Sequence, residues 1–219
     1  MRALTSFLPY VMPYVNGCTE PMAEQAILST CIEFCGKSCL VQRVIAESAV
    51  ADASDYDVEE PPQMVLVRIL QVFYGTRILK ARSLDTVTHA VAMRGESING
   101  ETIGSGTPTE WFARDPSNPI VSVYPPPAAA ANEILTIRAA YQPSRSATSV
   151  EDTLYDDYAE DIAAGAVARL LGMPNQSFSN PLSIKAFRDQ FLGAVSAASV
   201  IARVGLGAAS SRIKPVRFA

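Results

Sequence analysis

Apolar residues recur every three or four positions near both ends of the chain, which is the spacing of a buried helix face. After Thr19-Glu20-Pro21, a hydroxyl N-cap with an acidic, proline-containing first turn, this spacing predicts a helix over about 20–38. The capping-box pattern Ser149-Val150-Glu151-Asp152 predicts the start of a second helix. Asn180-Pro181 opens a third helix that runs to Gly205, and small residues on the last two helices predict a closely packed antiparallel pair.

The middle of the chain instead alternates β-branched and polar residues, which is typical of strands. Gly75 lies between two such runs and predicts a hairpin whose return strand is 78–81. A short helix is expected over 84–93, followed by a loop over 95–108 that is rich in Gly, Ser, Thr and Asn. The other predicted strands are 41–47, 56–58, 65–73, 120–124 and 134–141.

This order predicts an α+β fold in which a helical bundle is built from both ends of the chain. An antiparallel β-sheet or sandwich module is inserted between them, and an extended basic tail follows. The predicted parts are helical residues 1–39, a β-rich insertion over 40–148, helical residues 149–207 and a tail over 208–219.

Composition narrows the function classes. The chain has 219 residues, 48% of them hydrophobic and 18% charged, with a formal net charge of −4 and a single histidine. That charge argues against gripping a polyanion, and one histidine removes most metal sites and acid–base constellations. Pro9 and Pro13 interrupt the apolar N-terminus, and no run of 18 apolar residues occurs, so a soluble protein without a signal peptide is expected.

The four cysteines, at 18, 31, 35 and 39, are too few and too clustered for a disulfide scaffold and favour a reducing compartment. Cys31, Cys35 and Cys39 share one face of the predicted helix. They could be considered as metal ligands, but they lack a fourth ligand and a CxxC pair, so core packing is the favoured interpretation.

Two other polar groups invite a chemical interpretation. Ser83, Asp85 and His89 contain the residue types of a hydrolase triad, but three residues on one short local helix cannot surround a substrate. Five carboxylates crowd the start of the second helical segment and could bind a cation, although stabilisation of the helix dipole on a solvated face explains them more simply. They are Asp152, Asp156, Asp157, Glu160 and Asp161.

Four landmarks follow one another along nearly the whole chain. The first is Leu8-Pro9 and Gly17-Cys18, before a helix that ends Ile32-Glu33-Phe34-Cys35, and the second is Gly106-Thr107-Pro108-Thr109-Glu110-Trp111-Phe112. The third is the strand pair 120–124 and 134–138, with prolines at 125–127 and 143. The fourth is 158–166, followed by Leu170-Leu171, Asn180-Pro181 and 187–191. In this order the chain resembles the bacteriophage head-to-tail adaptor proteins, of the head-completion or tubular tail protein A type.

The resemblance implies a structural virion protein without enzymatic activity or cofactor. Such a subunit forms a ring, usually of twelve copies, between the portal protein and the tail tube or nozzle protein. Genome DNA passes through the ring without specific binding, and no membrane is involved. The expected location is the head-to-tail junction of the virion, after synthesis in the cytoplasm of the host bacterium.

The resemblance also implies that the C-terminal segment reaches the portal. The residues expected to dock there are Arg212, Lys214, Val216, Arg217 and Phe218. Two alternatives remain: another tail or connector component, such as a tail terminator or nozzle-side protein, and a small hydrolase that uses His89.

Overall fold

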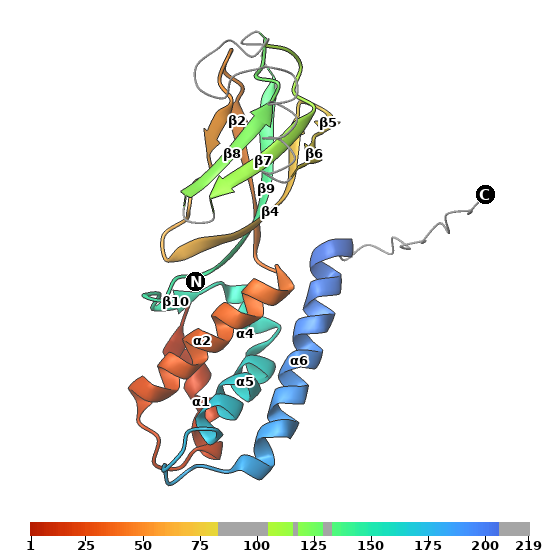
Figure 1. Ribbon diagram of the computed structural model, residues 1–219. Coiled ribbons are helices and arrows are strands. Elements are labelled where there is room, and N and C mark those ends of the chain that lie inside the picture. Colours follow the sequence, from red (N-terminus) through yellow and green to blue (C-terminus); the bar gives the residue numbers. More distant parts are fainter. Residues whose placement is uncertain (83–104, 116–117, 129–132, 206–219) are drawn as a thin grey trace, which may run out of the picture. The chain divides into compact units, whose positions relative to one another are not determined.

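The computed structural model describes residues 1–82, 105–115, 118–128 and 133–205, and it is an α+β protein (Figure 1). The chain divides into two compact units, one made of Met1–Val41 with Pro143–Ala219 and the other of Gln42–Gln142. The chain therefore leaves the first unit once and returns to it once. The crossings fall at 41–42 and 142–143, whereas the predicted boundaries were 39–40 and 148–149, so residues 143–148 belong to the helical unit rather than to the insertion.

The predicted first helix is confirmed as α2 (Glu20–Ser38). Thr19 occupies the N-cap position with extended backbone, but its side chain makes no capping hydrogen bond, so Pro21 and the backbone define this end. The helix ends at Ser38, within the predicted range. Cys39 follows in the left-handed conformation, and its amide donates to the Cys35 carbonyl at 2.9 Å, which closes the last turn.

The predicted capping role of Ser149 is wrong. Ser149 and Val150 form β10 (Ser149–Val150), which pairs antiparallel with β1 (Arg2–Ala3). The N-terminal segment supplies a backbone partner that a local sequence pattern cannot reveal. The predicted second helix is consequently two helices, α4 (Asp152–Asp156) and α5 (Ala159–Leu171).

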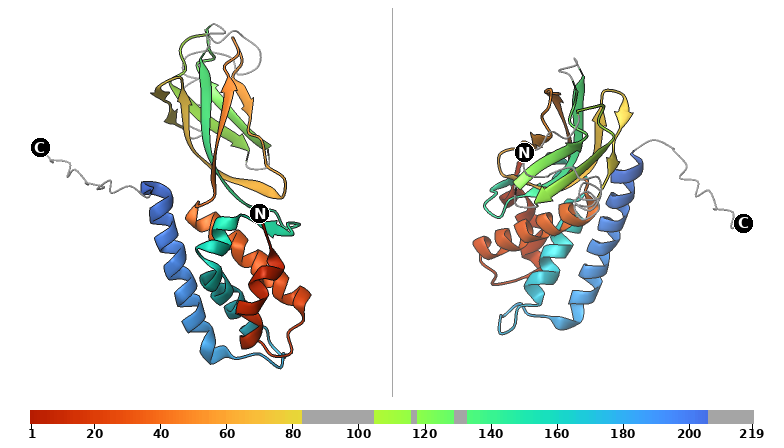
Figure 2. Two further views of the ribbon diagram at one scale, coloured as in Figure 1. Left: turned by 180° about the vertical axis from the view of Figure 1, so that it is seen from behind. Right: turned by 45° about the horizontal axis from the view of Figure 1, so that its top comes forward.

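The third predicted helix is confirmed as α6 (Pro181–Val204), preceded by Asn180 and ended by Gly205 at φ 74°. Helix α6 lies beside α5 (Figure 1, Figure 2). The two helices run antiparallel: Gly172, at the end of α5, faces Ile184 near the start of α6, whereas Gly165, seven residues earlier in α5, faces Phe191 further along α6. Ile201 lies three residues after the buried Ala198, a spacing that would put it on the buried face, but it is 37% exposed.

The backbones of three helices approach one another closely at Gly165. A Cβ atom there would lie 2.5 Å from Thr30 Cγ2 on α2 and 2.7 Å from Phe191 Cδ2 on α6. Phe34 and Phe191 fill the adjoining space with ring centroids 6.1 Å apart, and both are buried. The absence of a side chain at 165 thus allows three helices to approach one another.

The segment before α2 forms short helical turns against this core. Pro9 and Pro13 each stand in the first turn of their element, where no backbone donor is lost. Phe7 and Val11, which stand four residues apart, are both buried and hold the turns against the core. These turns are η1 (Leu4–Phe7), α1 (Leu8–Val11) and η2 (Met12–Tyr14).

The inserted unit contains all the long predicted strands. Its alternating sequence pattern places one set of side chains, including Leu135, Ile137 and Val121, in the interior. The strands are β2 (Gln42–Ser48), β3 (Asp55–Asp57), β4 (Met64–Tyr74), β5 (Arg77–Ile78), β6 (Lys80–Ala81), β7 (Glu110–Asp115), β8 (Asn118–Tyr124) and β9 (Ile134–Pro143).

These strands form two four-stranded sheets, in the orders β2-β9-β4-β5 and β3-β8-β7-β6. The predicted hairpin is present, with Gly75 at φ 56° and Tyr74 paired with Arg77. Its return strand is not 78–81 as predicted. Leu79 is buried and separates β5 from β6, which joins the other sheet in a parallel pair with β7.

Two polar side chains are integrated into this core. The buried Tyr141 ring brings its hydroxyl to the Glu59 carbonyl, to which it donates at 2.9 Å. The buried Ser122 hydroxyl donates to the Asp55 carboxylate at 2.5 Å and links β8 to β3. Both hydroxyl groups therefore have a hydrogen-bond partner, as most buried polar atoms in folded proteins do.

Some predicted features cannot be compared with this fold. The helix over 84–93 and most of the loop over 95–108 lie outside the described residues. Within the described ranges, none of the helices has the length and apolar character that crossing a bilayer requires.

Candidate functional site

The residues predicted to dock on the portal are not placed by the structure. Arg212, Lys214, Val216, Arg217 and Phe218 lie outside the described residues. The same is true of the Ser83, Asp85 and His89 set. A candidate site must therefore come from the parts of the two units that the structure describes.

The cysteines of α2 are mainly core residues. Cys31 and Cys35 are buried, whereas Cys39 is partly exposed at the helix end. Burial raises the pKa of the Cys31 thiol to about 12 and also raises that of Cys35, so these groups are poor nucleophiles at neutral pH. Among residues that the structure describes, no cluster of His, Cys, Asp and Glu has the composition of a metal site.

The acidic residues near α4 take part in surface ion pairs. The Asp152 carboxylate accepts a hydrogen bond from the Met1 amino group at 2.8 Å, and this bond, with the charges of that group and of Arg2, lowers the pKa of Asp152. Arg2 also reaches Asp156 at 3.5 Å. All these groups are well exposed, so the pairs add little stability.

A second charged group joins the three long helices. The Glu33 carboxylate on α2 binds Lys37 one turn later at 2.5 Å, Arg169 on α5, and Arg188 on α6 at 3.4 Å. Burial of the carboxyl opposes ionisation, but the Lys37 hydrogen bond and the charges of all three cations outweigh it and lower the pKa of Glu33. We call Glu33 with these three cations the Glu33 clamp. It joins α2, α5 and α6 and carries three positive charges against one negative charge.

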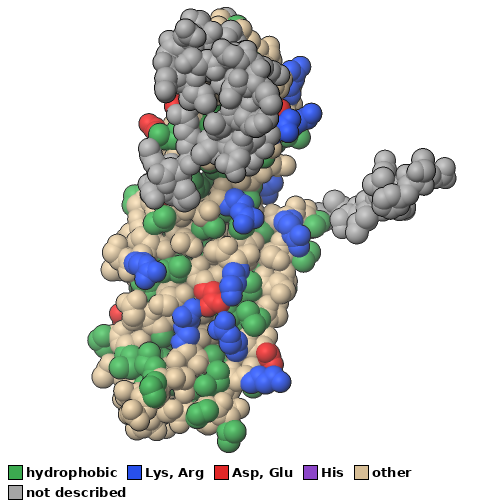
Figure 3. Space-filling view, viewed as in Figure 1, with side chains coloured by type: hydrophobic (Ala, Val, Ile, Leu, Met, Phe, Trp, Pro, Cys, Tyr) green, Lys and Arg blue, Asp and Glu red, His purple; other side chains and the backbone are tan. Residues whose placement is uncertain are grey.

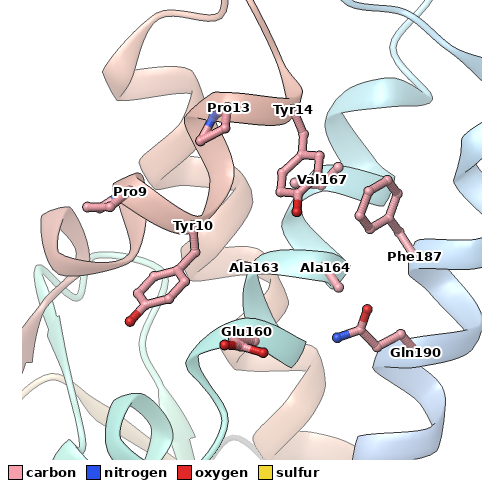
Figure 4. Close-up of a pocket in the computed structure, with 10 residues that line it drawn as sticks. All are labelled: Pro9, Tyr10, Pro13, Tyr14, Glu160, Ala163, Ala164, Val167, Phe187 and Gln190. Carbon is pink, nitrogen blue, oxygen red and sulfur yellow. The ribbon is translucent and has the colours of Figure 1, made fainter.

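A groove of about 380 Å³ lies in the helical unit where the N-terminal turns meet α5 and α6 (Figure 4). Side chains from the three elements converge on it, and of its ten lining residues only Glu160 carries a charge. We call it the aromatic groove. Its lining is Pro9, Tyr10, Pro13, Tyr14, Glu160, Ala163, Ala164, Val167, Phe187 and Gln190.

Edge-to-face pairs of aromatic rings lie along the aromatic groove. Tyr14 and Phe187 meet edge to face, with centroids 5.2 Å apart and planes at 73°. The ring centroids of Tyr10 and Tyr155 lie 6.3 Å apart, and the Arg2 guanidinium lies 4.8 Å from the centroid of the Tyr155 ring. Since rings in such arrangements stabilise one another, the groove walls are held in place before any ligand arrives.

The groove offers apolar contact and two exposed polar groups at its edge, the Glu160 carboxylate and the Gln190 amide (Figure 4). Tyr14 is 58% exposed and Tyr10 is 38% exposed. Exposed aromatic residues around a depression of mixed polar and apolar lining are common at protein-binding surfaces. The groove is therefore a candidate docking site for an apolar segment that carries a cation.

Sequence reasoning missed this groove. Tyr10 and Tyr14 stand four residues apart, but the turns around them are too short and proline-interrupted to show a helical period. The signal that could have found them was the density of aromatic residues and prolines over 7–14. Phe187 was named only within the landmark 187–191, which carries no sign of a surface groove.

Comparisons with protein-family models and with curated proteins gave no match for this chain.

Proposed function

We propose that this protein is a phage head-to-tail adaptor, a structural ring subunit between the portal and the tail tube or nozzle. The observation that carries the proposal is the division of the chain, in which both ends build one helical unit and 42–142 form a separate β unit. The family that the sequence resembles combines the same two parts. In finer terms, we propose a helical bundle, an inserted β-sandwich module and an extended basic C-terminal arm.

The charge distribution is compatible with this role. A net charge of −4 disfavours tight contacts with DNA phosphates, so DNA could pass a ring of such subunits without being held. A ring subunit also needs stable surfaces for its neighbours, and the preformed aromatic groove offers one.

The proposal is tested by mixing the purified protein with the portal protein encoded in the same genome and imaging the particles by electron microscopy. We expect a ring of this protein stacked on one face of the portal ring. A protein that neither binds the portal nor assembles on it would contradict the proposal. Finding it only at the far end of the tail would support a tail terminator or nozzle-side protein instead.

Deletion of residues 208–219 is expected to weaken portal binding by about tenfold or more while the fold persists. The segment carries Arg212, Lys214 and Arg217 and no carboxylate, so it suits an acidic partner surface. Binding is measured by surface plasmon resonance on immobilised portal, and folding by circular dichroism. A full-length variant with these three cations changed to Gln separates charge from length. Unchanged portal affinity of the deletion protein would rule out the docking arm.

A further inference from the structure

The exposed face of α6 changes character halfway along the helix. Its first half carries Lys185, Arg188 and Asp189, as a solvated helix face does. From 190 to 204 the only charged residue is Arg203. Nevertheless Val200 in this half is 50% exposed, and Val204 is 37% exposed. Figure 3 shows hydrophobic groups and a basic group at this end of the helix.

The polar side chains of the second half turn back onto the helix. The Ser196 hydroxyl donates to the Leu192 carbonyl at 2.9 Å, and the Ser199 hydroxyl donates to the Ser196 carbonyl at 2.8 Å. Arg203 Nε donates to the Ser199 carbonyl at 3.2 Å. The two serine hydroxyls are therefore bonded to the helix backbone, and the exposed residues around them include the apolar Val200 and Val204.

Gly193 adds to this picture. A Cβ atom there would meet nothing within 4 Å, so packing within the described chain does not require glycine. Glycine inside a helix costs about 1 kcal/mol relative to alanine. We call this exposed surface the α6 ridge, and its residues are Leu192, Gly193, Ser196, Val200, Arg203 and Val204.

The α6 ridge and the aromatic groove are complementary. The ridge is convex and apolar with one cation, Arg203, and the groove is concave and aromatic with one anion, Glu160. No ion pair of Glu160 or Arg203 occurs within the described part of the chain. Both surfaces belong to the same helical unit but occupy different places on it, so each copy carries one of each.

We propose that the α6 ridge of one copy docks in the aromatic groove of a second copy, with Arg203 facing Glu160. The inference rests on the proposed function, because it assigns the contact between neighbouring subunits of the ring. Pairing of two different surfaces repeats head to tail and closes into a ring when the rotation per subunit allows it. Val200 and Val204 would lie against Tyr14 and Phe187, where desolvated aromatic contacts contribute most to binding.

Val200→Asp tests the contact, since it places a charge in the centre of the ridge at an exposed helix position. We expect it to weaken self-association by about tenfold or more in sedimentation velocity measurements over a range of concentrations. Leu182→Asp is the matched control, because Leu182 is an exposed apolar residue in the first half of the same helix. This control should assemble like the wild type, and circular dichroism should show both variants folded.

Charge reversal identifies the partner surface. Arg203→Glu and Glu160→Arg should each weaken association, and the double variant should recover most of it. Rings that form equally well in Val200→Asp and in both reversals would overturn the inference, and so would a wild-type protein that stays monomeric at every concentration. Portal binding is measured separately, so the adaptor function can stand when this contact fails, or fail when it stands.

Discussion

Gly165→Ala is expected to destabilise the helical unit by about 2–3 kcal/mol, although alanine is the better helix former. The new methyl group would meet Thr30 Cγ2 and Phe191 Cδ2 at distances that real Cβ atoms do not reach. Neither neighbour yields easily. The Thr30 hydroxyl donates to the Ala26 carbonyl at 2.8 Å, and the Phe191 ring is buried between helices.

The measurement is urea unfolding followed by the helical circular dichroism signal. Gly193→Ala is the matched control, since it makes the same change in a helix where the new Cβ has open space. This control should raise the free energy of unfolding by about 0.5–1 kcal/mol. If both variants shift stability in the same direction, the three-helix approach at Gly165 is not as tight as the structure indicates.

Glu33→Gln is expected to cost about 2 kcal/mol of unfolding free energy at neutral pH. The substitution keeps the size of the side chain but removes the charge that holds Lys37, Arg169 and Arg188 together. Only 15% of the Glu33 side chain is exposed, so its ion pairs are better shielded than ordinary surface pairs. The cost stays below that of a fully buried pair because the three cations can still reach water.

The pH dependence of this effect has a definite sign. The folded-state pKa of Glu33 is below its ordinary value of 4.5, so the unfolded chain takes up this proton first as the pH falls. The contribution is therefore complete above the unfolded-state pKa and is lost as the pH falls through the folded-state pKa. The difference in stability between wild type and Glu33→Gln should shrink over this acidic window.

Glu24→Gln provides the control on the same helix, since Glu24 makes no ion pair among the residues that the structure describes. It should change stability by less than about 0.5 kcal/mol at any pH. A wild-type advantage over Glu33→Gln that persists unchanged at low pH would show that the Glu33 charge is not its source.

Sequence patterns predicted the elements whose signals are local. Thr19-Glu20-Pro21 located the start of α2 and Asn180-Pro181 that of α6, because proline and a change in periodicity mark a helix start within a few residues. Alternation likewise located β4, β8 and β9. These features depend on a residue and its immediate neighbours.

The errors arose where a distant segment supplied the partner. Ser149 has the side chain of a cap, but Arg2 and Ala3 engage its backbone in a strand pair. The return strand after Gly75 ends early because Leu79 enters the interior and Lys80 pairs with Glu110 of the other sheet. Neither partner could be read from the local pattern, since each is separated from it by many residues.

The candidate site depends even more on distant contacts. The aromatic groove combines Tyr10 and Tyr14 with Glu160 and Phe187, and the Glu33 clamp combines three helices. The sequence by itself determined the helical ends, the β insertion and the presence of a single charged residue, Arg203, in the second half of α6. Only the tertiary structure decided which of these surfaces is buried and which is exposed, because burial depends on what packs against a residue rather than on the residue alone.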